Sequence, residues 1–177
     1  MAELNTRGSS KPPPLPKAAS AYLSHLQSPW KLWLYFIKNL PSALWWGLRI
    51  EQVNERESRI VIPYNWRTKN PFRSIYFAAL AGAGELSTGV LASMARLGQG
   101  DISMLVLEQR AEFFKKASST ITFTCTQGAE VQETVQRAID TLEAQTITML
   151  GTGRNMSGEI VCKIFITWTF KVRTPKK

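Results

Sequence analysis

The sequence contains only two cysteines and one histidine, which limits the chemistry that its side chains can support. Cys125 and Cys162 lie far apart, and together with His25 they form no CxxC pair or His-Cys cluster of the kind that binds zinc. We therefore expect no metal site, and both thiols are more typical of ordinary strand residues than of a disulfide. A Ser-His-Asp or Cys-His mechanism would have only His25 as its base.

The sequence also lacks long uncharged runs and a recognisable secretion signal. The longest runs without a charged side chain are residues 18–30 and 117–129, well below the roughly 20 residues that a helix needs to cross a bilayer. Residues 1–16 are polar and broken by prolines, which is not the pattern of a signal peptide. We therefore predict a cytoplasmic protein without a membrane-spanning helix.

Acidic residues are few relative to basic ones, with 13 Asp and Glu against 22 Lys and Arg and a formal net charge of +9. This excess favours an anionic partner, which is a nucleic acid, a membrane surface or a small molecule that carries phosphate. The basic residues are not accompanied by an RNP, GxxG or zinc-finger pattern, so we do not expect nucleic acid as the partner.

A chain of 177 residues, of which 44% are hydrophobic, is long enough for one packed domain. Residues 1–17, rich in proline, serine and lysine, predict a flexible N-terminal arm, and residues 18–177 predict a single domain. The domain begins with a helical segment, residues 18–39, which Pro29 is expected to break in two. Its aromatic residues, such as Trp30, suit either packing across a sheet or subunit, which we favour, or a membrane interface.

The remaining pattern predicts an α+β protein. Hydrophobic periodicity indicates strands at residues 48–54, 58–64, 104–116, 119–126, 146–150 and 159–172, a long helix at 76–96 and a short helix at 130–142. Gly98 follows the long helix, as glycines that end helices do. Two strands, a long helix and about four further strands suit a sheet that wraps around one helix.

Glu85 stands out on the predicted long helix because its neighbours on the same face are small. At about 100° per residue, a helix wheel places Glu85 on one stripe with Ala78, Ala81, Gly82, Thr88, Gly89 and Ala92. A solvated face normally carries Lys, Gln and Glu, so this stripe indicates that backbone or a ligand approaches closely. Lost hydration there would raise the pKa of the carboxylate toward the range of a general base. A bridge from Glu85 to an arginine or to backbone amides explains the same pattern equally well.

Three motifs resemble those of hotdog-fold proteins. The run Ser74-Ile75-Tyr76-Phe77-Ala78, followed by small residues up to Glu85, resembles the start of the central helix in hotdog-fold acyl-CoA thioesterases of the phenylacetate-pathway type. In that family His-Gly-Gly precedes a small-residue helix with an Asp or Glu, and Glu85 falls on the acidic position. The motif Phe113-Phe114-Lys115-Lys116-Ala117 is similar to the family's Phe-Leu-Arg-Pro-Ala strand. Asn70-Pro71-Phe72, with the helix start and Gly84-Glu85-Leu86, more closely resembles the hotdog branch known as the DUF4442 family.

The resemblance covers about residues 48–172 and implies a hotdog fold, in which an antiparallel sheet wraps around a long central helix. It also implies that the site lies between subunits, so we expect a homodimer or a dimer of dimers. One departure concerns the helix start. Where the thioesterases carry His-Gly-Gly this chain carries Tyr76-Phe77-Ala78, without the histidine or the glycines that let backbone approach the thioester.

The resemblance implies roles for individual residues as well. Glu85 would be the general base or the nucleophile, Asn70 would orient water or substrate, and Thr88 would hydrogen-bond the carboxylate or the water. Backbone amides at the helix start would polarise the thioester carbonyl. The predicted substrate-binding residues are Ser74, Tyr76, Phe77, Ala78, Arg67, Lys69, Arg73, Lys115 and Lys116, and the basic ones would contact the phosphates of coenzyme A.

We therefore predict a thioesterase that hydrolyses an acyl-CoA or a similar thioester, with coenzyme A as part of the substrate and no separate cofactor. One alternative is a non-catalytic acyl-binding or assembly module, which the missing His-Gly-Gly supports. A second alternative is a peripheral membrane protein that binds through Trp30, Trp33 and basic residues. As the partner of this protein, the sequence favours a thioester over a membrane surface.

Overall fold

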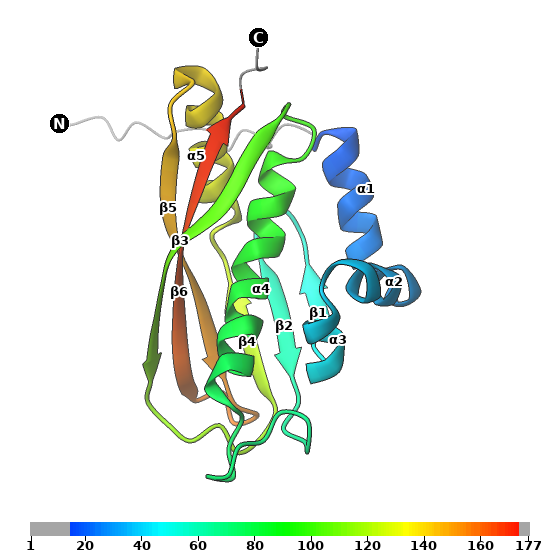
Figure 1. Ribbon diagram of the computed structural model, residues 1–177, viewed down its shortest axis with the longest axis vertical. Coiled ribbons are helices and arrows are strands. Elements are labelled where there is room, and N and C mark those ends of the chain that lie inside the picture. The colour runs from blue at the N-terminus through cyan, green and yellow to red at the C-terminus, as the bar shows by residue number, and fades with distance from the viewer. Residues whose placement is uncertain (1–14, 174–177) are drawn as a thin grey trace, which may run out of the picture.

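Within residues 15–173, which the computed structural model describes, the chain forms five helices and six strands (Figure 1). The predicted flexible arm at residues 1–17 lies outside the described residues except for its last three positions, and the first helix begins at Lys17. The helices are α1 (Lys17–Leu26), α2 (Pro29–Asn39), α3 (Pro41–Trp46), α4 (Phe77–Arg96) and α5 (Gly128–Thr141). The strands are β1 (Arg49–Val53), β2 (Ser58–Ile62), β3 (Ile102–Phe113), β4 (Ile121–Cys125), β5 (Gln145–Arg154) and β6 (Ile160–Val172).

The strands form one antiparallel sheet in the order β1-β2-β4-β5-β6-β3. Alternation of side chains sets which face of the sheet enters the core, as β4 illustrates: Ile121, Phe123 and Cys125 are buried, while the threonines between them are half-buried. The long ladder between β3 and β6 leaves β3 as one outer strand, and β1 is the other. The observed elements confirm the predicted α+β class and its antiparallel sheet.

The sheet curves around α4, which lies along its concave face (Figure 1). Two glycines of α4 permit this contact, because a Cβ added at Gly84 would lie 2.6 Å from Ile164 of β6, and one at Gly82 would lie 2.6 Å from the Trp46 ring of α3. Helix α4 is long and apolar enough to cross a membrane. The length of the uncharged runs in the sequence had not predicted such a helix. However, 56% of the qualifying window is buried inside the fold, as in the core helix of a globular domain.

The three N-terminal helices lie beside α4 on the side of β1 (Figure 1). Prolines set their boundaries: Pro29 breaks the predicted helical segment and begins α2, and Pro41 begins α3. The sequence pattern did not predict α3, because a helix of one and a half turns is too short to show a period. Helix α1 packs on α4 and β1, and α3 packs on α4, so the segment forms one wall of the space beside the central helix.

Candidate functional site

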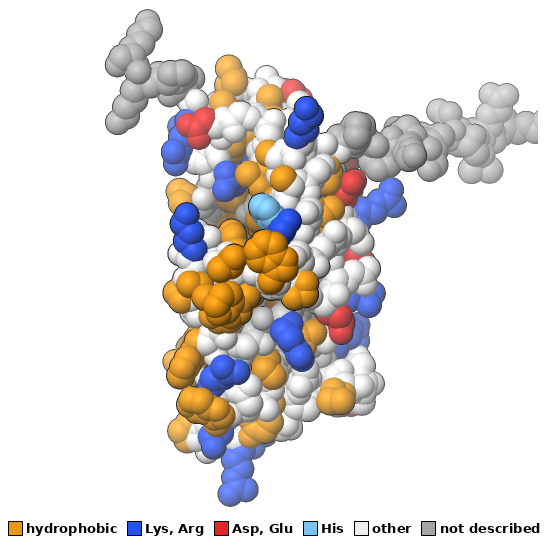
Figure 2. All heavy atoms as spheres, turned by 90° about the vertical axis from the view of Figure 1, so that its right-hand side faces the viewer, with side chains coloured by type: hydrophobic (Ala, Val, Ile, Leu, Met, Phe, Trp, Pro, Cys, Tyr) orange, Lys and Arg blue, Asp and Glu red, His pale blue; other side chains and the backbone are white. Residues whose placement is uncertain are grey.

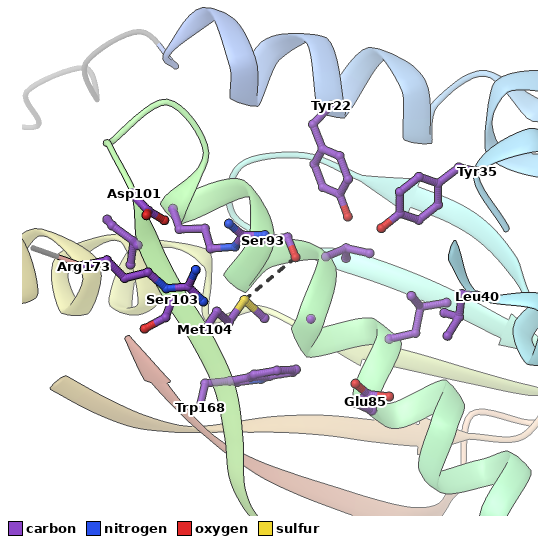
Figure 3. A pocket seen from close by; sticks show the side chains of 15 residues that line it. Tyr22, Tyr35, Leu40, Glu85, Ser93, Asp101, Ser103, Met104, Trp168 and Arg173 are labelled. Atoms are coloured by element: carbon purple, nitrogen blue, oxygen red, sulfur yellow. Dashed lines mark hydrogen bonds between the residues drawn. The ribbon is translucent and has the colours of Figure 1, made fainter. Parts of the chain in front are cut away.

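A cavity of about 440 Å³ opens beside the middle of α4, between the N-terminal helices and the ends of β3 and β6 (Figure 3). Helices α1 and α2 contribute Tyr22 and Tyr35, whose hydroxyl groups point into it (Figure 3). The other residues that line it are Leu40, Glu85, Leu86, Gly89, Val90, Ser93, Arg96, Asp101, Ile102, Ser103, Met104, Trp168 and Arg173. Glu85 and Arg173 lie on opposite sides of Trp168, and Asp101 lies at the same end of the cavity as Arg173 (Figure 3).

Glu85 is exposed in the single chain and opens onto this cavity. Within residues 15–173 its carboxylate forms no ion pair and no hydrogen bond, so the bridge to an arginine or to backbone amides is not observed there. The cavity walls remove part of the hydration of the carboxylate, and this desolvation raises the pKa of Glu85 above its usual value. The pKa of Glu85 is therefore shifted in the direction that the sequence predicted. The Glu85 side chain is, however, more exposed than its small neighbours on the helix had led us to expect.

The small residues beside Glu85 are covered by aromatic side chains of the same chain. A Cβ added at Gly89 would contact the Trp168 ring at 3.4 Å, and Gly82 is covered by Trp46. The close approach predicted from the sequence is thus made by tryptophans from α3 and β6. Trp168 is also a wall of the cavity, so the small stripe shapes the site through its packing.

Thr88 is fully buried and its hydroxyl is committed to other groups. The hydroxyl donates to the backbone oxygen of Glu85 at 2.9 Å and accepts the indole N–H of Trp168 at 3.0 Å. No hydrogen bond between this hydroxyl and the Glu85 carboxylate forms among the described residues. The structure therefore places Thr88 behind the cavity wall, where it fixes the orientation of Trp168.

Asn70 and Ser74 shape the loop that leads into α4. The side-chain oxygen of Asn70 accepts the backbone N–H groups of Phe72 and Ser74 and the Ser74 hydroxyl, at 3.0 to 3.2 Å. Such an arrangement holds a tight turn, in which Arg73 adopts a positive φ of 58°. Neither Asn70 nor Ser74 lines the cavity of Glu85.

The first turn of α4 presents free amide donors and two exposed rings. In the part of the chain that the structure describes, the N–H groups of Phe77 and Ala78 donate no hydrogen bond, while Tyr76 donates to Thr68 at 2.7 Å. Open amides at a helix start favour negative charge. The Tyr76 and Phe77 rings pack edge to face, 5.0 Å apart, and Phe77 is 59% exposed.

These amides and Glu85 are too far apart to act together within one chain. Glu85 lies eight positions after Phe77, which corresponds to about 12 Å along the helix axis. A thioester carbonyl spans only a few ångströms. The helix-start amides and the Glu85 carboxylate, which the prediction combined in one site, therefore lie at two separate places on α4.

The predicted basic residues lie away from Glu85, in the segments beside the helix start, except that the Arg67 guanidinium lies beside Gly47. Ile75 donates its N–H to the backbone oxygen of Ala117 at 2.8 Å, which brings the loop before α4 next to Lys115 and Lys116. Lys115 is paired with Glu159, and this pairing and the neighbouring Asn155 lower the pKa of Glu159 to about 2. The other predicted cations, Arg67, Lys69, Arg73 and Lys116, form no ion pair among the described residues.

Several residues of the cavity were not predicted from the sequence. Tyr22 and Tyr35 carried only the periodicity of a helix, and their rings meet edge to face at 6.2 Å. Burial raises the pKa of the Tyr22 phenol well above its usual value, so its hydroxyl stays neutral. Arg96 and Arg173 lie far apart in sequence and had no motif that would link them.

The two thiols are unsuited to nucleophilic chemistry. Cys125 and Cys162 are buried in β4 and β6 and are not joined by a disulfide. Burial raises the pKa of Cys125 to about 11 and that of Cys162 to about 12, so both stay protonated at neutral pH. Among residues 15–173 no three potential metal ligands lie together.

Comparison with protein families gives a match over residues 35–170, to the family described as Domain of unknown function (DUF4442). A comparison with curated proteins finds no match.

Solved structures share the arrangement of most of the described chain. A protein of unknown function from Chlorobaculum tepidum is 16% identical with a TM-score of 0.70, over 86% of this chain and 99% of that chain. A thioesterase from Haemophilus influenzae is 14% identical with a TM-score of 0.57, over 81% and 92% of the two chains. A thioesterase variant from Pseudomonas aeruginosa is 18% identical with a TM-score of 0.58, over 82% and 95%. At these identities the likeness shows the fold alone, and it confirms the predicted hotdog fold.

Proposed function

The chain belongs to the DUF4442 family and has the hotdog fold, and from this premise we propose that it hydrolyses a thioester of the acyl-CoA type. The observation that carries the proposal is the Glu85 carboxylate, which lies in a cavity on the central helix with a raised pKa and no partner among the described residues. A carboxylate of this kind is suited to remove a proton or to attack a carbonyl carbon.

The chemistry follows one of two routes that begin at Glu85. In the first, the carboxylate takes a proton from water while the water oxygen attacks the thioester carbon. In the second, the carboxylate attacks the carbon itself, and water then opens the anhydride. In both routes the carbon–sulfur bond breaks, the thiolate of the leaving group takes a proton, and the acyl group leaves as a carboxylate.

Stabilisation of the developing oxyanion would come from the free amides of Phe77 and Ala78. Because these lie about 12 Å from Glu85 along one helix, we propose that each site joins the helix start of one subunit to Glu85 of a second copy. Support comes from β3, an outer strand whose Leu105, Val106 and Leu107 are exposed although all three are large and apolar. Pairing along β3 would bury these side chains.

The cations at the helix start support coenzyme A as the leaving group. Lys69, Arg73 and Lys116 are exposed in the loops beside Phe77 and Ala78, where phosphates of a bound thioester would lie.

One observation favours an acyl-binding module that does not hydrolyse its ligand. The exposed Phe77 ring occupies the position where the resembling thioesterases carry glycine, and a ring there limits the approach of a thioester to the amides. Such a module would use the same cavity and the same cations.

A panel of acyl-CoAs of different chain length and polarity distinguishes the two functions. Release of free thiol by the full chain would support hydrolysis, with calorimetric titration of the same panel as the parallel measurement. Saturable binding without thiol release would support the module and contradict hydrolysis. An absence of both would contradict both functions.

A further inference from the structure

Helix α2 is apolar on nearly all sides, yet Phe36 is the one buried residue among its eleven. Eight of these residues are apolar, from Pro29 to Ile37. A helix that is hydrophobic all round is normally enclosed by protein or lipid. In the chain as described, the outward side of α2 is covered by nothing, so this apolar surface needs an occupant.

The uncovered residues form one continuous stripe. Trp30, Trp33, Leu34 and Ile37 follow the spacing i, i+3, i+4, i+7, and all four are exposed, Trp30 at 63% and Trp33 at 52%. We call these four residues the α2 stripe. In the view of the face that carries α1 to α3, hydrophobic side chains gather at the centre, with Lys and Arg side chains around them (Figure 2).

The inner side of α2 packs on the rest of the chain, so the stripe is a second apolar surface. Leu32 and Phe36 face an apolar groove of about 820 Å³ between the helices and the outer strand β1. Trp33 belongs to both the groove and the stripe, and Arg49, Glu51 and Arg67 also line the groove. The apolar surface therefore continues from the helix into the groove and ends at charged side chains of β1 and of the loop after β2.

The N-terminal segment that carries the stripe has charged side chains of one sign. From Leu15 to Ile50 the sequence contains no Asp or Glu, whereas Lys17, Lys31, Lys38 and Arg49 are basic. Lys31 lies over the Trp30 ring at 5.7 Å, and Lys38 is exposed at the end of the helix. An anionic lipid surface is complementary in charge to this basic segment.

We propose that the α2 stripe docks on an anionic lipid bilayer. The two tryptophans and the aliphatic side chains would enter the boundary between headgroups and acyl chains, where indole rings are favoured. The lysines would contact lipid phosphates at the level of the headgroups. The stripe faces away from the fold, and the groove beside it is bounded by β1 and not by β3, so docking leaves the outer strand β3 free.

Vesicle flotation of the full chain tests this docking directly. The chain is expected to float with vesicles that contain 30% phosphatidylglycerol, to float at least tenfold less with pure phosphatidylcholine, and to lose binding as salt is raised. Trp30→Ser with Trp33→Ser should reduce flotation at least tenfold, and so should Lys31→Glu with Lys38→Glu. All four side chains are outside the core, and circular dichroism would verify that each variant is folded.

A matched control separates this surface from net charge. Arg137→Glu with Lys171→Glu, at two exposed positions on α5 and β6, changes the charge of the chain by the same amount away from α2, and it should retain most of the flotation. No flotation of the folded full chain would overturn the proposal and leave a protein partner as the occupant of the stripe. Equal flotation of the full chain and both α2 variants would also overturn it.

Discussion

At the scale of single residues, the proposed chemistry depends on Glu85, whose carboxylate has no partner among residues 15–173. Glu85 lies in the middle of α4, where neither helix end can stabilise its charge, and the cavity walls withhold water from it. The pattern of small residues identified Glu85 in the sequence. Its neighbours across the cavity, such as Tyr22, Tyr35 and Arg173, could not be identified, because each is brought there by a different element.

Glu85→Gln should make the protein more stable at neutral pH. Because the pKa is raised in the folded state, wild-type stability falls as pH rises through that raised pKa, and glutamine removes this loss. Below about pH 4 both the folded and unfolded carboxyl groups hold a proton, so the difference should shrink. Urea unfolding at pH 4 and at pH 7.5 measures it, and a variant that is less stable at pH 7.5 would show that the carboxylate has a stabilising partner.

Thr88→Val should destabilise the protein by about 1–3 kcal/mol, because it leaves the buried indole N–H of Trp168 without an acceptor. Thr88→Ser keeps the hydroxyl and serves as the control, with an expected loss of less than about 1.5 kcal/mol. Denaturant unfolding measures both variants. If valine is tolerated as well as serine, the hydrogen bond does not hold the cavity wall.

At the scale of elements, hydrophobic periodicity was sufficient to predict α4, α5 and the six strands to within a few residues at most boundaries. Strands β3 and β5 differ most. β3 ends at Phe113 because Phe114 and Lys115 both turn to donate to the Val161 oxygen. β5 continues to Arg154 through two glycines that the sequence pattern had placed in a turn. Close packing against Phe123 and Ser87 holds these glycines in the strand, which no local pattern indicates.

Alanine should change the stability of the protein differently at two glycines of α4. Gly84→Ala forces a methyl group into Ile164, at a cost of about 1–3 kcal/mol that exceeds the gain of about 1 kcal/mol in helix propensity. Gly89→Ala meets the Trp168 ring only at van der Waals distance, so the propensity gain should keep stability unchanged or raise it. Thermal unfolding compares them, and equal melting temperatures would contradict this difference in packing.

At the scale of the whole molecule, the candidate site is divided between two places on one helix. The sequence placed the helix-start amides and Glu85 in one mechanism but could not show the distance that separates them. Their division follows from helix geometry, at about 1.5 Å per residue. A second copy that pairs along β3 is the simplest arrangement that would bring the two places together.

Leu105→Lys with Leu107→Lys should convert a dimer into a monomer. Both side chains are exposed in the single chain, at 63% and 60%, so the subunit should remain folded while the contact between copies is lost. Light scattering coupled to size exclusion measures the mass. Met156→Lys, at an exposed position in the turn between β5 and β6, is the control and should stay dimeric. A wild-type monomer, or a variant that remains dimeric, would rule out β3 as the interface.

The most direct measurement of the proposed function is kcat/KM for thioester hydrolysis by wild-type protein and by Glu85→Gln, from pH 4 to pH 9. We predict that the wild-type value rises with pH through a midpoint above the usual 4.5 of a glutamate. Loss of a general base should lower it by at least about 100-fold and remove that rise in the variant. Equal values with the same pH dependence in both proteins would contradict a catalytic role for Glu85.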